Sequence, residues 1–389
     1  MKRLIITVIS AFFIFYNCHG STEIPVPGAS RFEEYKNLIV GRSVAVVANQ
    51  TSMIGGIHLI DFLLSKGIVI KMIFAPEHGF RDLADDGDVI SSGTDPLTGI
   101  NVMSLYGEKK KPAPEDLEGV DAVIFDIQDV GARFYTYLTT MCYVMEACAE
   151  NGKPFIVLDR PNPNGFYVDG PILDTARYRS FVGIHPIPVV HGMTLGEYAG
   201  MVNGEGWLPG GIECNLTVIK CENYTHSTMY ELPVIPSPNL PNMNSIYLYP
   251  SICFTEGTVL SCGRGTEFPF QVLGAPKMPD TGFSFTPQPS FGSSRPKHDG
   301  LTCYGTDLRN AMSEGIVPKP QINPGWIIDA YNAYPEKENF FIPYFDVLAG
   351  TSTFREQIIR GMTAEEIRAS WRKGLDRFRE RRAKYLLYD

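Results

Sequence analysis

Short apolar runs alternate with amphipathic segments along the first half of the chain. Residues 57–66 and 136–151 have apolar positions at helical spacing, and Gly67 and Gly152 follow them as helix stops. Five apolar runs have the length typical of strands: residues 43–48, 69–74, 101–105, 121–125 and 155–158. This alternation predicts a mostly parallel sheet covered on both faces, in an α/β domain over residues 31–184.

The pattern changes in the second half, where proline- and glycine-rich loops separate shorter elements. Thr194 and Glu197 have the spacing of a capping box at the start of a helix over residues 194–203. The other elements expected here are strands over 216–220 and 258–260 and helices over 353–360 and 363–385. Thr363 and Glu366 have the spacing of a capping box at the start of the last helix. We expect a smaller α+β domain over residues 185–389, packed on the first, with the active cleft between the two domains.

Residues 1–20 have the features of an export signal. Lys2 and Arg3 precede an apolar run over residues 4–16, which is too short to span a bilayer. We expect cleavage after residue 20 and an exported, periplasmic protein. A lipid anchor through Cys18 is the alternative. No later stretch of the sequence is long and apolar enough to be a transmembrane segment.

Charge and cysteine content exclude several classes of protein. Lys2 and Arg3 are the only charged residues of the signal, so the remaining chain keeps 32 of the 34 basic and all 43 acidic residues, a net charge of −11. This charge argues against a nucleic-acid binder. The seven cysteines that follow the signal are widely spaced and include no Cys-x-x-Cys pair. They do not suggest a disulfide framework or a structural zinc site. Without a G-x-G-x-x-G or Walker motif, nucleotide binding has no support in the sequence, and we expect no cofactor. Without H-x-H or H-E-x-x-H spacing, we expect no metal.

Polar side chains follow five of the predicted strands at the point where each strand ends: Asn49-Gln50, Glu77-His78, Tyr106, Asp126 to Asp129, and Asp159-Arg160. Because the carboxyl ends of parallel strands meet at one edge of a sheet, we expect these side chains to line one crevice. The loop containing Glu77, His78 and Arg81 offers a carboxylate, an imidazole and a guanidinium for proton transfer and anion recognition.

Further candidates surround this crevice. Asp126 and Asp129 could instead form turns. Tyr135 and Tyr137 could simply be partly buried, and His191 could be a core residue. Arg133 suits a carboxylate, and an aromatic ring suits the face of a sugar. The remaining candidate ligand-binding residues are Tyr135, Tyr137, Asn162, His191, Asn239 and Arg264.

Taken together, these motifs resemble the NamZ-type exo-β-N-acetylmuramidases, glycoside hydrolase family 171. The resemblance runs from about residue 31 to residue 389 and is carried by seven segments: 77–81, 126–137, 159–163, 191–194, 236–241, 263–266 and 382–388. One departure is Asp82, where the family loop often continues with glycine. The resemblance implies a Rossmann-like N-terminal domain, a smaller C-terminal domain and an active cleft between them. It also implies release of N-acetylmuramic acid from the non-reducing end of peptidoglycan-derived muropeptides or disaccharides.

For this reaction we expect Glu77 to be the general acid and Asp126 or Asp129 the partner carboxylate. A substrate-assisted route, in which the sugar's own 2-acetamido oxygen attacks, is equally admissible. The lactyl carboxylate of muramic acid requires a cation, for which the candidates are Arg81, Arg133, Arg264 and His191. A metal-dependent hydrolase is one alternative, because many of these residues are ligand types. A periplasmic sugar-binding protein with two lobes is another.

Overall fold

The computed structural model describes residues 23–77, 79–81 and 93–389. The expected signal segment, Cys18 and His78 lie outside the described residues, and so does Asp82. Within the described part of the chain, no helix combines the length and apolar character needed to cross a bilayer.

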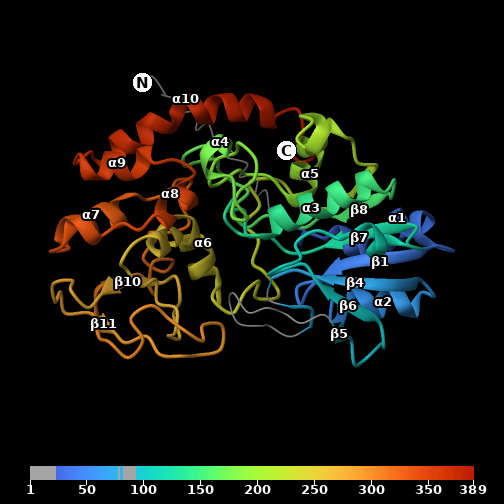
Figure 1. Ribbon diagram of the computed structural model, residues 1–389, viewed down its shortest axis with the longest axis horizontal. Coiled ribbons are helices and arrows are strands. Elements are labelled where there is room, and N and C mark those ends of the chain that lie inside the picture. Colours follow the sequence, from blue (N-terminus) through green and yellow to red (C-terminus); the bar gives the residue numbers. More distant parts are fainter. Residues whose placement is uncertain (1–22, 78, 82–92) are drawn as a thin grey trace, which may run out of the picture.

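A seven-stranded sheet forms the first lobe, with the strand order β5-β6-β4-β1-β7-β8-β9 (Figure 1). Its strands are β1 (Ser43–Ala48), β4 (Val69–Ala75), β5 (Gly93–Thr94), β6 (Asn101–Ser104), β7 (Ala122–Asp126), β8 (Phe155–Leu158) and β9 (Leu216–Ile219). Only β5 pairs antiparallel. Counted along the chain, the six parallel strands have the order 3-2-1-4-5-6, which is the Rossmann order, as predicted.

Helices cover both faces of this sheet. Alternate residues of β7 point to opposite faces, so Val123 and Phe125 join one apolar cluster while Ala122 and Ile124 join another. The first cluster includes α3 (Tyr137–Glu150) and α5 (Leu195–Gly204). The second includes α1 (Phe32–Ile39) and α2 (Leu59–Ser65). The central strands β1, β7 and β8 are therefore mostly apolar because both of their faces are buried.

The helix expected over residues 57–66 begins later than predicted. Ile57 and His58 form β3 (Ile57–His58), which pairs with β2 (Met53–Ile54) in a two-stranded hairpin. His58 is then the N-cap of α2, and its side chain accepts a hydrogen bond from the Ile60 N–H. The apolar spacing alone does not reveal this turn.

The sheet lobe continues beyond residue 184, where we expected it to end. The predicted strand at 216–220 is β9, and it pairs with β8 as the last strand of the large sheet. Helix α5 packs against α3, β8 and β9, and it begins at the predicted capping box of Thr194 and Glu197. A boundary at residue 184 would therefore separate α5 and β9 from the sheet on which they pack.

The second lobe contains helices and a small antiparallel sheet of order β10-β12-β11. Its elements are α6 (Met243–Ile252), η4 (Cys253–Gly257), β10 (Val272–Ala275), β11 (Ser284–Phe285), β12 (Cys303–Asp307), α7 (Gly325–Ala333), α8 (Tyr344–Ala349) and α9 (Thr353–Ile359). η5 (Lys337–Asn339) lies between α7 and α8, and the short elements outside this lobe are η1 (Gly28–Ser30), η2 (Pro114–Leu117), α4 (Thr175–Tyr178) and η3 (Pro209–Gly211).

The strand predicted over residues 258–260 is wrong. Thr258 makes only an isolated bridge with Phe341. The Lys297 ammonium donates to the Thr258 and Leu260 carbonyls at 2.6 and 3.0 Å. A side chain thus satisfies carbonyls that a neighbouring strand would otherwise bind.

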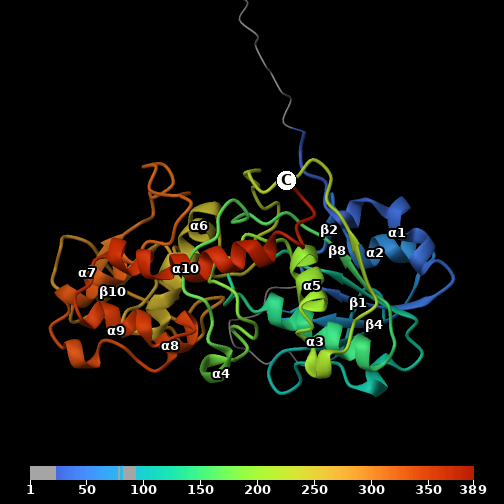
Figure 2. The same ribbon diagram turned by 90° about the horizontal axis from the view of Figure 1, so that it is seen from above.

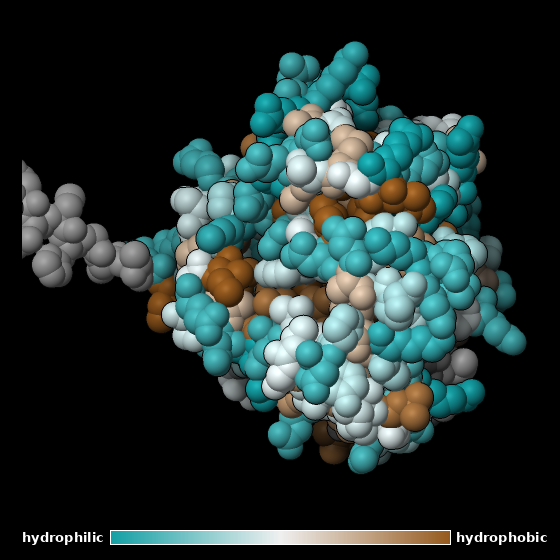
Figure 3. All heavy atoms as spheres, turned by 90° about the vertical axis from the view of Figure 1, so that its left-hand side faces the viewer, coloured by the Kyte–Doolittle hydropathy of each residue, from teal (hydrophilic) through white to brown (hydrophobic). Residues whose placement is uncertain are grey.

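Helix α10 (Ala364–Arg382) connects the two lobes. It begins at the predicted capping box and runs across both lobes, so that the chain end returns to the sheet lobe (Figures 1 and 2). There the Tyr388 hydroxyl donates to Asp159 Oδ2 at 2.7 Å, and the Leu387 N–H donates to Glu197 Oε1 at 2.8 Å. One apolar core extends from the sheet to α10. Hydrophilic side chains cover most of the outer face of the second lobe (Figure 3).

Candidate active site

A pocket of about 560 Å³ lies between the two lobes, beyond the carboxyl ends of β4 and β6. The sheet lobe contributes Glu77 and the loops around Tyr106, Phe134 and Phe181, and the second lobe contributes α6, η4 and α8. Its polar and aromatic lining includes Glu77, Tyr106, Lys110, Phe134, Tyr135, Thr136, Phe181, Asn239, Tyr249, Glu256, Arg264, Phe270 and Tyr344. The position of the pocket agrees with the expected cleft between the lobes.

Glu77 stands two residues after the end of β4 and is only 8% exposed. The Thr136 hydroxyl lies 2.6 Å from Glu77 Oε2, and the Tyr137 hydroxyl donates to the Glu77 carbonyl at 3.3 Å. A hydroxyl can donate to a carboxylate or accept from a carboxylic acid, so the Thr136 contact is compatible with both protonation states. These contacts fix the carboxyl group at the pocket wall.

Glu256 is a second carboxylate of the pocket lining. Its Oε1 lies 2.7 Å from Arg264 Nε, and the Arg264 guanidinium stacks 4.9 Å from the centre of the Phe270 ring. The ammonium of Lys110, another pocket residue, lies 4.9 Å from the centre of the Phe181 ring. The pocket therefore combines two carboxylates and two cations with aromatic faces.

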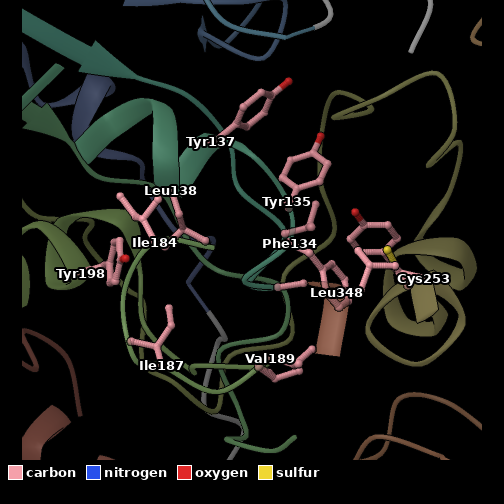
Figure 4. Close-up of a cluster of buried hydrophobic side chains, with 14 of the residues drawn as sticks. Phe134, Tyr135, Tyr137, Leu138, Ile184, Ile187, Val189, Tyr198, Cys253 and Leu348 are labelled. Atoms are coloured by element: carbon pink, nitrogen blue, oxygen red, sulfur yellow. The ribbon is translucent and has the colours of Figure 1, made fainter. Parts of the chain in front are cut away.

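Phe134, Tyr135 and Tyr137 belong to a cluster of buried side chains next to Cys253 and Leu348 (Figure 4). Tyr135 packs edge-on against Tyr137 at 4.8 Å and against Tyr249 at 5.9 Å. The Tyr135 hydroxyl donates to the Pro236 carbonyl at 2.9 Å, which ties the sheet lobe to the loop after residue 235. A flat apolar face with hydroxyls at its edge suits the ring of a sugar.

Four of the predicted site residues line this pocket: Glu77, Tyr135, Asn239 and Arg264. The Asn239 amide donates to the Gly292 carbonyl at 2.6 Å, so its nitrogen also supports the neighbouring loop.

Asp126 does not line the pocket. It is fully buried, and its two oxygens bind Arg160 at 2.5 and 2.9 Å. The arginine comes from the end of β8, the strand beside β7. Because both carboxylate oxygens are engaged, the geometry supports a structural ion pair at the strand ends.

Asp129 also lies outside the pocket lining, on the loop that follows β7. Its Oδ2 accepts a hydrogen bond from the Gly131 N–H at 2.6 Å, whereas Oδ1 has no partner among the described residues. Burial raises the pKa of this carboxyl group from 3.8 to about 7. Asp129 is thus a buried acid without a cationic partner.

The raised pKa of Asp129 predicts a pH-dependent contribution to stability. Between about pH 4 and pH 7 the folded protein keeps a proton that the unfolded chain releases, so stability falls as the pH rises through this window. Asp129→Asn removes the ionisation. Between pH 4 and pH 8, the melting temperature of the wild type should fall relative to that of the variant by about 2 °C or more.

Calorimetry at both pH values measures this difference, with Asp299→Asn on the exposed surface as the matched control. Parallel melting curves for the wild type and Asp129→Asn would contradict the prediction.

The two other predicted arginines are engaged elsewhere. Arg81 binds Asp61 at 2.7 and 2.8 Å and Asp95 at 3.1 Å, away from the pocket lining. Arg133 is buried and donates to the carbonyls of three residues: Pro171, Ile187 and Leu348. Arg133 precedes Phe134 in the chain and bonds to Leu348, and both of these residues line the pocket. Arg133 therefore connects two walls of the pocket without lining it.

Three further predicted binding residues are buried outside the lining. The Tyr137 hydroxyl accepts from the Asn49 amide at 3.0 Å. The Asn162 amide donates to the Met193 carbonyl at 2.8 Å. Burial lowers the pKa of His191 to about 3, and its Nδ1 accepts from the Met193 N–H. These side chains form hydrogen bonds inside the fold and do not line the pocket.

Lys110, Tyr249, Glu256 and Tyr344 are pocket residues that the sequence reasoning missed. Glu256 had a detectable signal, because it is the only charged residue between Glu231 and Arg264. An isolated carboxylate in an apolar stretch must find a partner or a functional position. Tyr249 had no such signal, since it reads as one more apolar position of a helix.

Comparisons with known proteins cover nearly the whole chain. Family models described as Exo-beta-N-acetylmuramidase NamZ match in two parts, the N-terminal model over residues 44–244 and the C-terminal model over residues 247–388. The peptidoglycan beta-N-acetylmuramidase NamZ of Bacillus subtilis (strain 168) is 40% identical over 382 residues, which cover 91% of this chain and 89% of that protein.

Two solved structures of DUF1343 family proteins from Bacteroides fragilis NCTC 9343 have the same architecture. One is 47% identical with a TM-score of 0.87, and the other is 30% identical with a TM-score of 0.76. Each comparison covers 94% of this chain and 99% of the solved chain. The junction of the two family models, between residues 244 and 247, falls where α6 begins.

Proposed function

Since this chain belongs to the NamZ exo-β-N-acetylmuramidase family, we propose that it releases N-acetylmuramic acid from the non-reducing end of peptidoglycan fragments. It is a glycoside hydrolase. The observation that carries the assignment to this pocket is the meeting of Glu77, Glu256 and Arg264 beside aromatic rings, between the lobes. A carboxylic acid, a carboxylate and a cation are the groups needed to cleave a glycoside of an acidic sugar.

Glu77 protonates the leaving glycosidic oxygen. Its place at the end of an apolar strand and its contact with Thr136 hold the carboxyl group in a nearly dry position. A general acid must be held within hydrogen-bonding distance of the oxygen that it protonates.

Glu256 is the partner carboxylate that the pocket itself offers. Either it assists attack on the anomeric carbon, or the 2-acetamido oxygen of the sugar attacks and Glu256 orients its N–H. NMR of the released sugar distinguishes inversion from retention. Inversion means that water attacks directly and excludes participation of the acetamido group, whereas retention follows from the acetamido route or from a covalent intermediate on Glu256. The catalytic role that we expected for Asp126 or Asp129 stays a prediction, and neither residue lines the pocket.

Turnover tests the proposal against its two alternatives. Purified protein should release N-acetylmuramic acid from a disaccharide that carries this sugar at the non-reducing end, and prolonged EDTA treatment should leave the rate unchanged. Among the described residues, no three His, Cys, Asp or Glu side chains gather as a metal site. Loss of activity with EDTA and its return with a divalent metal would favour the metal-dependent hydrolase. Tight binding without turnover would favour a sugar-binding protein.

A further inference from the structure

A second hollow of about 440 Å³ adjoins the active pocket. We call it the side compartment. Its lining consists of Glu256, Leu260, Ser261, Cys262, Arg264, Ser293, Ser294, Arg295, Pro296, Lys297 and Tyr344. Glu256, Arg264 and Tyr344 line both hollows, so a ligand in the active pocket can extend into the side compartment past Arg264.

The walls of the side compartment are held by partly buried hydrogen bonds. The Lys297 ammonium binds the Thr258 and Leu260 carbonyls, and His298 Nε2 lies 2.6 Å from the Val259 carbonyl. These contacts fasten the segment around residue 297 along the chain that follows η4. The compartment is therefore present before any ligand arrives.

Close packing also brings two arginines to one rim. Gly265 has a φ of +80°, and a Cβ atom there would lie 2.7 Å from the Pro296 ring. Glycine is required at this position because the two loops touch. Arg264 precedes Gly265 and Arg295 precedes Pro296, and both arginines line the side compartment.

The lining has an excess of positive charge in a chain whose net charge is −9. The lining includes Arg264, Arg295 and Lys297 with one carboxylate, Glu256; Glu256 is paired with Arg264, and the Lys297 ammonium binds backbone carbonyls. Arg295 is exposed and makes no hydrogen bond or ion pair with any described residue. Three serine hydroxyls add further donors. This composition suits a carboxylate ligand.

We propose that the side compartment binds a carboxylate carried by the substituent at O3 of the sugar, with Arg295 as its recognition residue. The carboxylate belongs either to the lactyl group itself or to a peptide attached to it. This inference rests on the proposed function of the active pocket. It makes the side compartment the place where muramic acid is distinguished from N-acetylglucosamine, which has no such substituent.

Three β-glycosides of N-acetylmuramic acid test the proposal: one with a free lactyl carboxylate, one with that group converted to an uncharged methylamide, and one with a carboxylate-bearing dipeptide attached to it. The wild type should hydrolyse at least one charged substrate with about tenfold higher kcat/KM than the methylamide. Arg295→Gln should remove most of this preference. Arg372→Gln, an exposed change on α10, is the matched control and should preserve it.

The outcomes separate the inference from the function on which it rests. A preference for the free acid or for the peptide supports the inference and identifies the source of the carboxylate. Equal rates on all three substrates overturn the inference while leaving the glycosidase intact, and so does a preference that Arg295→Gln does not alter. If no substrate is hydrolysed, the proposed function itself fails.

Discussion

Glu77→Gln should lower kcat for release of N-acetylmuramic acid by about 10²-fold or more. The amide keeps the size of the side chain and can still contact the Thr136 hydroxyl, but it cannot deliver a proton to the leaving oxygen. The fold should therefore survive while the chemistry is lost. The measurement is the initial rate on an activated and on an unactivated glycoside, because a good leaving group needs less protonation and should be less affected.

Glu118→Gln, an exposed carboxylate of the same lobe, is the control and should retain the wild-type rate. Glu256→Gln in the same assay tests the second pocket carboxylate. Near-normal hydrolysis by Glu77→Gln on the unactivated substrate would show that another group is the acid.

Asp126→Asn should destabilise the protein by about 3–5 kcal/mol, because it leaves the buried Arg160 guanidinium without its counter-charge. The double variant Asp126→Asn with Arg160→Met removes both charges and should recover much of this loss. Urea unfolding followed by circular dichroism measures both changes. Wild-type stability of the single variant would refute the structural role.

The double variant also decides whether Asp126 has a catalytic role. If the Asp126 carboxylate only forms the ion pair, the folded double variant should hydrolyse substrate at a rate close to that of the wild type. A folded double variant whose rate falls by about 10²-fold would restore Asp126 as the partner carboxylate.

The sheet lobe was largely predictable because its strands are buried on both faces. β1 and β8 have the bounds that their apolar runs indicate, and α5 and α10 begin at their predicted capping boxes. The second lobe was harder to predict. α6 contains Pro250 in an apolar stretch, and β10 pairs with β12 across a long loop, which leaves no local signal.

The candidate site was predictable in position and only partly in composition. Parallel strands do place Glu77 and Asp126 at one edge, since β4 and β7 both pair with β1. A position at a strand end does not determine whether a side chain faces the pocket, because a neighbouring arginine can bind a carboxylate inside the edge, as Arg160 binds Asp126. The family resemblance, carried by motif order over the whole chain, is confirmed.

Helix α10 joins the two lobes, and this connection affects the free energy of substrate binding. With a common core beneath the pocket and the chain end held at Asp159 and Glu197, the lobes form a single mechanical unit. Catalytic groups in such a unit keep their separations in the absence of sugar, which is electrostatic preorganisation. The affinity for the saccharide is then not reduced by the work of a hinge closure.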